Sequence, residues 1–232
     1  MVLFEQLQAG VEYQCQTLLN LYDSPYGDRL ATQAAAGRHL RVVKLPKNSD
    51  DSIQVCLCED DYPGYLSLLD IGGLELAATN YQARSLNTTE ISTRLPKVIK
   101  FTHQAMQQPN YYLWGGTTAP NYDCSGLIQA AFADSGIWLP RDAYQQEAFT
   151  QSIPIEEILP GDLVFFGVDK ATHVGLYLGS GFYVHSSGQE IGRNGIGIDS
   201  LSEKADPVSQ SYYRQFRCCG RVVKCYQPRG EG

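Results

Sequence analysis

Residues 123–136 read Asp-Cys-Ser-Gly-Leu-Ile-Gln-Ala-Ala-Phe-Ala-Asp-Ser-Gly. They predict a short amphipathic helix over residues 125–135, because apolar side chains recur at helical spacing and a glycine follows the last turn. Asp123 is the expected N-cap, since its carboxylate can accept hydrogen bonds from the first backbone N–H groups of the helix. Cys124 then lies at the helix start, where the positive end of the helix dipole lowers a thiol pKa. We therefore consider Cys124 a candidate nucleophile.

The alternative for Cys124 is a packing role, because free cysteines are among the most buried residue types. Its small polar neighbours and the histidines further along the chain distinguish it from the other cysteines. None of those has the spacing of a zinc site, so we expect neither a metal nor a cofactor. The other six cysteines are Cys15, Cys56, Cys58, Cys218, Cys219 and Cys225.

The whole chain has the composition of an ordinary folded protein. Its 232 residues are 43% hydrophobic and 19% charged, which suits one large domain or two small ones. A net charge of -7 does not indicate nucleic acid or an anionic membrane as a partner. No apolar stretch approaches the ~18–20 residues of a membrane span, and the first residues do not resemble a secretory signal. We expect a cytoplasmic protein with free thiols, since its number of cysteines is odd.

The first third of the chain differs in pattern from the rest. Short β-rich runs alternate with turn signals, which predicts a small all-β barrel over residues 1–80. The polar residues 81–91 are the expected linker to a second domain over residues 92–232. The predicted strands of the first domain are 13–18, 40–43 and 53–58, and its predicted turns are 23–28, 46–50 and 62–64.

The second domain begins with a helical pattern and continues with strand patterns. Apolar residues lie on one helical face up to Met106, and Thr89 or Ser92 is available as the cap. Pro96 suggests that the regular helix begins there, because proline is favoured in the first turn. Helices followed by an antiparallel sheet give an α+β fold class. The predicted strands are 161–166, 173–178, 182–185 and 218–223.

Two histidines lie on neighbouring predicted strands. His173 opens one strand and His185 closes the next, and the Gly-Ser-Gly sequence at residues 179–181 predicts a hairpin between them. If the strands pair, the two side chains approach each other and can meet Cys124 at the helix start. A thiol nucleophile needs an imidazole base and a third group to orient it, so these residues form a candidate Cys-His-His site. Two unrelated histidines are the alternative, and the other two, His39 and His103, are expected to be surface or packing residues.

Five motifs follow one another in the second domain. They are Tyr-Leu-Trp-Gly-Gly (112–116), Asp-Cys-Ser-Gly-Leu (123–127), Leu-Pro-Arg (139–141), Leu-Pro-Gly-Asp-Leu-Val-Phe-Phe (159–166) and His-Val-Gly-Leu-Tyr (173–177). In this order they resemble the NlpC/P60 cysteine peptidases, over about residues 93–226. The first domain is similar to the bacterial SH3 domains that precede this peptidase. The combination resembles the bacterial γ-D-glutamyl-L-diamino acid endopeptidases.

The resemblance implies a papain-like α+β core, with Cys124 as nucleophile, His173 as general base and His185 as the residue that orients it. It also implies that the backbone N–H of Cys124 and the hydroxyl of Tyr112 hold the oxyanion. The implied substrate is L-Ala-γ-D-Glu-diamino acid from murein, cut between the γ-carboxyl of D-Glu and the diamino acid.

Four residues within the motifs are candidates for substrate binding. Asp123 serves as N-cap or pairs with a substrate ammonium, and Ser125 faces the substrate or serves the first helical turn. Arg141 could pair with the α-carboxylate of D-Glu through both its nitrogens, although an arginine after Leu-Pro more often anchors a loop. Trp114 and the two glycines after it are expected to shape the wall beside Cys124, where the backbone must approach closely.

Residues 59–65 are the most acidic and aromatic run of the first domain. The simpler interpretation of this run is a solvated turn with packed tyrosines. The functional hypothesis is that Asp61 and Tyr65 receive the free amino end of the peptide.

We therefore expect a cysteine endopeptidase that acts on small murein peptides in cell-wall peptide recycling, without an obligate protein partner. One alternative is a non-catalytic module that binds murein peptides. Retention of the cysteine and both histidines argues against that alternative. Another alternative is an amidase or acyltransferase on the same fold. Its reaction products would differ from those of the endopeptidase.

Overall fold

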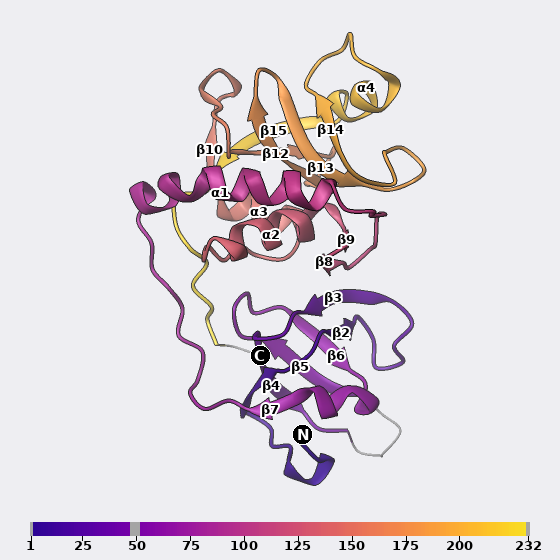
Figure 1. Ribbon diagram of the computed structural model, residues 1–232, viewed down its shortest axis with the longest axis vertical. Coiled ribbons are helices and arrows are strands. Elements are labelled where there is room, and N and C mark those ends of the chain that lie inside the picture. Colours follow the sequence, from indigo (N-terminus) through magenta and orange to yellow (C-terminus); the bar gives the residue numbers. More distant parts are fainter. Residues whose placement is uncertain (1, 47–51, 231–232) are drawn as a thin grey trace. The chain divides into compact units, whose positions relative to one another are not determined.

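The structure, a computed structural model, describes residues 2–46 and 52–230 and divides the chain into two compact units. The first unit comprises Met1–Ala83 together with Gln227–Gly232, and the second comprises Arg84–Tyr226. Figure 1 shows that the first is built mainly from strands, whereas the second combines helices with a sheet. Within the described residues, no helix is both long and apolar enough to cross a bilayer.

Seven short strands form the sheet of the first unit. They pair in the order β3-β2-β6-β5-β4-β1-β7, and each pairing is antiparallel. Its core includes Leu21, Leu40, Val55 and Leu66, which are fully buried. The elements are η1 (Phe4–Gln6), β1 (Glu12–Cys15), β2 (Leu19–Tyr22), β3 (Leu30–Ala34), β4 (His39–Lys44), β5 (Ile53–Leu57), β6 (Pro63–Leu66), η2 (Leu68–Gly73) and β7 (Leu74–Leu76).

The strand-rich character predicted for this unit is confirmed, with two differences. Among the described residues the hydrogen-bonded sheet ends at β3 and β7, so no closed barrel forms. Residues 62–64 were predicted as a turn, but Pro63 and Gly64 belong to β6. Pro63 is tolerated because it takes the first position of the strand. The predicted turn at 46–50 lies largely outside the described residues.

The last described residues of the chain pack on the first unit. The Asp61 carboxylate accepts hydrogen bonds from the backbone N–H groups of Arg229 and Gly230, at 2.6 and 3.3 Å. Arg41 donates a hydrogen bond of 2.7 Å to the carbonyl oxygen of Gly230. The sequence indicated one linker, at residues 81–91, whereas the structure separates the units twice, after Ala83 and after Tyr226.

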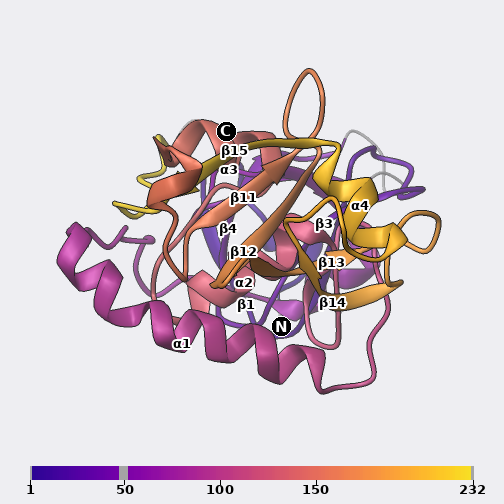
Figure 2. The same ribbon diagram turned by 90° about the horizontal axis from the view of Figure 1, so that it is seen from above.

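A six-stranded antiparallel sheet and two packed helices form most of the second unit. The strand order is β10-β15-β11-β12-β13-β14. α1 and α2 pack on each other, and α2 lies against β12 and β13, as Figures 1 and 2 show. This is the predicted α+β fold. The elements are α1 (Thr88–Met106), β8 (Thr117–Thr118), β9 (Asn121–Tyr122), α2 (Cys124–Asp134), α3 (Ala143–Phe149), β10 (Gln151–Ile153), η3 (Ile155–Glu157), β11 (Leu163–Phe166), β12 (His173–Gly179), β13 (Phe182–Ser187), β14 (Gly195–Ser200), α4 (Pro207–Tyr213) and β15 (Phe216–Arg221).

Helix α1 begins earlier than predicted. Its N-cap is Asn87, whose side chain accepts a hydrogen bond from Glu90 N–H, while the Glu90 carboxylate accepts one from Asn87 N–H. This reciprocal capping box satisfies two backbone donors at the helix start. Pro96 lies inside the helix at an exposed position, where water can reach the carbonyl group that loses its partner. The predicted start at Pro96 and the predicted cap at Thr89 or Ser92 are therefore wrong.

The predicted hairpin between the two histidine-bearing strands is confirmed. β12 and β13 pair antiparallel, with Leu176 opposite Val184. Ser180 and Gly181, which join the strands, have φ values of 52° and 81°. Positive φ at both central positions is the requirement of the type I′ turn, whose twist matches that of the strands.

The first turn of α2 lies directly against the glycine loop that precedes it. The backbone N–H of Asp123 donates a hydrogen bond of 3.0 Å to the carbonyl oxygen of Gly116. A Cβ atom at Gly126 would overlap the same oxygen, and one at Gly116 would come within 2.9 Å of two other carbonyl oxygens. The expected close approach of the backbone is confirmed for Gly116, and it involves Gly126 as well.

We expect Gly126→Ala to lower the free energy of unfolding by about 3 kcal/mol or more, because the overlap is with backbone and no side-chain rotation relieves it. The better helix propensity of alanine would offset only about 1 kcal/mol. Urea unfolding followed by circular dichroism measures the change. Gly188→Ala is the control, since a Cβ there meets only Tyr112 Cδ1 at 3.9 Å. Equal effects of the two substitutions would contradict the packing described here.

Candidate functional site

Cys124 is the first residue of α2, and Asp123 is the N-cap, as the sequence predicted. The Cys124 side chain is buried, and the backbone N–H groups of Ser125 and Val174 lie close enough to its sulfur to lower the thiol pKa. Val174 follows His173 in β12. The thiol therefore lies against the start of the strand that carries the candidate base.

The surroundings of Cys124 favour the thiol over the thiolate. Burial raises the pKa of Cys124 to about 12, and the negative charge of Asp123 also raises it. The two backbone N–H groups and the positive charge of Arg141 oppose this rise but do not outweigh it. The direction is opposite to the lowering expected from the helix start alone. The sulfur therefore keeps its proton until a base removes it.

The two histidines meet inside the second unit, as predicted. His173 Nε2 lies 2.6 Å from His185 Nδ1, and the ring planes are at 87° to each other. Burial lowers the pKa of both histidines, and the neighbouring His185 lowers that of His173 further. Both imidazoles are consequently neutral at pH 7, so His173 can act as a base.

The sequence did not reveal two residues that complete the surroundings of the histidines. Asp199 on β14 lies 2.6 Å from His185 Nε2 through its Oδ2 atom. Tyr212 on α4 stacks on His173 with 4.5 Å between ring centroids, and burial together with the nearby Cys124 raises the Tyr212 pKa to about 12. The alternating sequence Gly-Ile-Gly-Ile-Asp at 195–199 could have placed Asp199 near His185, but no local pattern marks Tyr212. In the described ranges no group of three or more His, Cys, Asp or Glu side chains could hold a metal ion.

Asp123 connects the segments on both sides of Cys124. Its carboxylate accepts hydrogen bonds from the backbone N–H groups of Gly126 at 2.7 Å and Gly115 at 2.9 Å. Arg141 donates to both oxygens of this carboxylate, at 3.1 and 2.6 Å, and to the Ser125 hydroxyl at 3.0 Å. With only 1% of its surface exposed, Arg141 is engaged inside the protein, and its pairing with a substrate carboxylate stays a prediction. Asp123 and Ser125 are likewise engaged with protein groups.

Tyr112 and Trp114 lie on the segment between α1 and β8. Burial raises the pKa of Tyr112, and so does its proximity to Cys124, so the phenol stays protonated and can donate a hydrogen bond near the sulfur. Trp114 is a largely exposed side chain next to Gly115, which is bound to Asp123. The roles of Tyr112 and Trp114 toward a substrate stay predictions.

Asp61 and Tyr65 belong to the first unit. The Asp61 carboxylate holds the backbone of residues 229–230, and Tyr65 lies on β6 opposite Gln54 and Tyr22. Asp61 therefore has a structural role within its own unit. That Asp61 or Tyr65 receives the amino end of a peptide stays a prediction.

The second unit is an α+β domain in which a buried thiol at a helix start lies against two paired strands that carry one histidine each. Residues 109–221 match the NlpC/P60 family, and residues 21–71 match the bacterial dipeptidyl-peptidase Sh3 domain. The chain thus contains an NlpC/P60 domain, and a bacterial Sh3 domain precedes it in the sequence.

Two relatives from Bacillus subtilis illustrate the similarity. A γ-D-glutamyl-L-lysine dipeptidyl-peptidase is 39% identical over 119 residues, which are 50% of this chain and 36% of the relative. The bifunctional muramidase/DL-endopeptidase CwlT is 48% identical over 81 residues, 33% of this chain and 25% of the relative. The match thus spans little more than a third of the first relative and a quarter of the second. Among solved structures, the peptidoglycan hydrolase RipB of Mycobacterium tuberculosis is 24% identical with a TM-score of 0.48, over 60% of this chain and 69% of that one.

We expect Arg141→Met to lower the free energy of unfolding by about 3–5 kcal/mol, because it leaves the buried Asp123 carboxylate without its ion pair. Urea unfolding measures the loss. The double variant Arg141→Met/Asp123→Asn removes the orphaned charge and should recover part of the stability. A double variant less stable than Arg141→Met would show that Asp123 is stabilising without Arg141, contrary to this account.

The buried histidines should make the protein less stable as the pH falls below about 6.5. The unfolded chain binds protons at its ordinary histidine pKa, whereas the folded chain resists them because the pKa of His173 and that of His185 are lowered. Each histidine contributes at most about 1.4 kcal/mol per pH unit. We expect the urea midpoint of the wild type to fall more between pH 7.5 and 5.5 than that of His173→Gln. Identical falls would refute the assignment of a lowered pKa to His173.

Proposed function

We propose that the protein is a cysteine peptidase that hydrolyses the γ-D-glutamyl-L-diamino acid bond of murein peptides. Two contacts carry the proposal. His173 and His185 lie against each other, and the thiol of Cys124 lies next to Val174, the residue that follows His173 in β12. The substrate class is supported by the name of the Bacillus subtilis relative, a γ-D-glutamyl-L-lysine dipeptidyl-peptidase. It is supported as well by the first unit, whose match is named for a dipeptidyl-peptidase.

Because Cys124 and His173 are both uncharged at rest, the order of the steps follows from the transfer of the thiol proton. His173 takes the thiol proton of Cys124 as the sulfur attacks the γ-carbonyl carbon of D-Glu, since a free thiolate is disfavoured in this buried position. The imidazolium of His173 then protonates the leaving amine of the diamino acid. Water attacks the thioester that remains, with His173 again as the base, and releases L-Ala-D-Glu and the thiol.

Two donors are available for the oxyanion of the tetrahedral intermediate. One is the backbone N–H of Cys124 at the start of α2, where the helix dipole favours negative charge. The other is the phenol of Tyr112, which stays protonated beside the sulfur. A donor of this kind typically contributes about 10²–10³ to the rate.

A dipeptidyl-peptidase removes two residues from a free amino end, so we propose that the natural substrates are small murein peptides released during cell-wall turnover. This role is tested by comparing the rates at which the protein cleaves free tripeptide and intact cell wall. Cytoplasmic location and independence of nucleic acid, membrane and protein partners stay predictions.

The direct test is incubation with L-Ala-γ-D-Glu-L-Lys and with its diaminopimelate counterpart, followed by mass analysis. Wild type should release L-Ala-D-Glu from at least one of them, and Cys124→Ala should lower kcat by about 10⁴-fold or more. Cys219→Ala is the matched control, because Cys219 is equally buried but lies in a separate apolar cluster on β15.

The other outcomes separate the alternatives. Binding of the peptide without cleavage by wild type would favour a non-catalytic module. Cleavage of the lactyl amide in a muramyl peptide, with the tripeptide left intact, would favour an amidase. Equal cleavage by wild type and Cys124→Ala would overturn the proposed nucleophile.

A further inference from the structure

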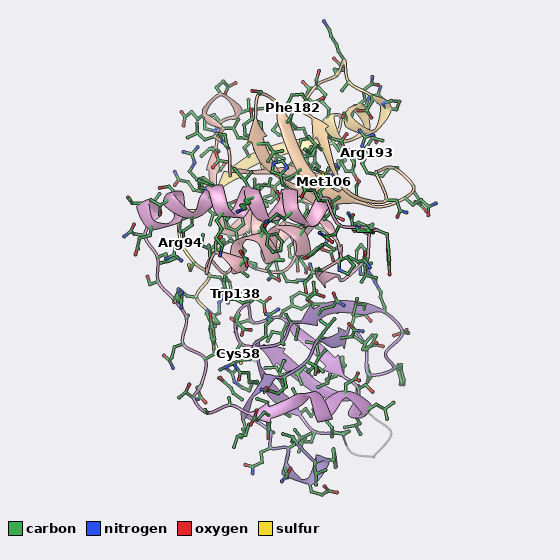
Figure 3. All side chains as sticks on the ribbon, viewed as in Figure 1. Cys58, Arg94, Met106, Trp138, Phe182 and Arg193 are labelled. Carbon is green, nitrogen blue, oxygen red and sulfur yellow. The ribbon has the colours of Figure 1, made fainter. Side chains whose placement is uncertain are left out.

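A network of charged groups extends from the histidine pair to the surface, with Asp199 buried and with Arg193 and Asp206 exposed. The Asp199 side chain is fully buried, and its two oxygens have different partners. Oδ2 faces His185 Nε2, whereas Oδ1 accepts hydrogen bonds from the Arg193 guanidinium and from the Ser209 hydroxyl. Arg193, labelled in Figure 3, comes from the segment between β13 and β14 and also donates to Asp206, the N-cap of α4.

The backbone makes room for this network at one position. Gly197 lies opposite His185 in the β13–β14 pairing. A Cβ atom at Gly197 would come within 2.7 Å of Arg193 Cγ. The absence of a side chain therefore lets Arg193 cross β14 and reach Asp199.

Asp199 is held as a carboxylate. Burial by itself would raise its pKa, but hydrogen bonds from His185, Arg193 and Ser209 keep the pKa well below its usual range. A carboxylate can only accept hydrogen bonds. The short contact with His185 Nε2 therefore requires a proton on that nitrogen.

We propose that Asp199 is a positioning residue that fixes the protons on both histidines and so leaves Nδ1 of His173 free to accept the proton of Cys124. With its proton on Nε2, neutral His185 presents an unprotonated Nδ1 to His173. The 2.6 Å contact between the rings then requires the proton of neutral His173 to lie on Nε2. The inference rests on the proposed function only through the roles of Cys124 and His173.

The network also favours the imidazolium that forms when His173 takes the proton. It holds two carboxylates, Asp199 and Asp206, but one cation, Arg193. The other titratable groups around the rings are the phenols of Tyr183 and Tyr212 and the Cys124 thiol, all uncharged at pH 7. Asp199 is thus the nearest negative charge to the pair.

Asp199→Asn makes the proposal testable, because the two oxygens are not equivalent. Arg193 can only donate, so the amide oxygen of the variant must occupy the Oδ1 position and the amide nitrogen must face His185 Nε2. His185 then carries its proton on Nδ1, and His173 must carry its own on Nδ1, where it can no longer accept one from Cys124. A comparable inversion of tautomer in a serine protease lowers kcat by about 10⁴-fold.

Two readouts do not depend on the peptide substrate. Nitrogen NMR of histidine-labelled protein shows which ring nitrogens carry protons, and we expect both tautomers to invert in Asp199→Asn. Alkylation of Cys124 by iodoacetamide, mapped by mass analysis across pH 5–9, should be about tenfold or more slower at pH 7. The kcat for the tripeptide should fall by about 10⁴-fold with little change in KM. If wild type does not cleave the tripeptide, the proposed function fails while the first two readouts still test Asp199.

Two variants distinguish positioning from a structural role. Asp162→Asn is the matched control, since Asp162 is a buried carboxylate paired with Arg221 on the same sheet but contacts no histidine. It should leave alkylation and tautomers unchanged. Asp199→Asn/Arg193→Met lets the amide turn its oxygen to His185, so alkylation should recover relative to Asp199→Asn. Unchanged tautomers and alkylation in Asp199→Asn, or further loss in the double variant, would overturn the proposal.

Discussion

The second unit depends on the buried carboxylate of Asp123. It caps α2, binds the glycine loop before the helix and pairs with Arg141 beyond its end. The position of Cys124 therefore follows from contacts of its neighbour in sequence. This arrangement has a cost, because burial and, to a smaller extent, the same charge raise the thiol pKa to about 12. The backbone N–H groups at the start of α2 lower the thiol pKa, but they do not outweigh burial.

Neutrality at rest is the result of this balance. Cys124 keeps its proton, and the buried His173 remains an unprotonated base. In the proposed mechanism, charge then appears on the sulfur and on the imidazole together, when the proton moves. The two charges form next to groups that are already oriented, namely the N–H groups at the start of α2 on one side and the histidine pair backed by Asp199 on the other. Such preorganisation is where enzymes obtain much of their rate enhancement.

The sequence predicted those features of the fold that depend on interactions between residues close together in the chain. Asp123 as a cap, the start of α2 and the turn at 180–181 follow from backbone requirements that a few neighbouring residues satisfy. The role of Arg141 could not be predicted in this way, because its partner lies 18 residues away and both are buried only after folding. Tyr212 meets His173 for the same reason, through tertiary packing of a seven-residue helix. At α1 the capping box formed by Asn87 and Glu90 fixes the start of the helix, whereas Pro96 had suggested a later start.

Residues 227–230 pack on the first unit, so this unit is formed by two separate segments of the chain. Topologically, the NlpC/P60 unit is an insertion into the Sh3-type unit, since the chain leaves the latter after Ala83 and re-enters it after Tyr226. A boundary drawn once, as in a simple tandem array, would cut the first unit in two. Transfer of the whole Sh3-type unit to another protein by recombination would therefore need two crossovers, one on each side of the NlpC/P60 segment.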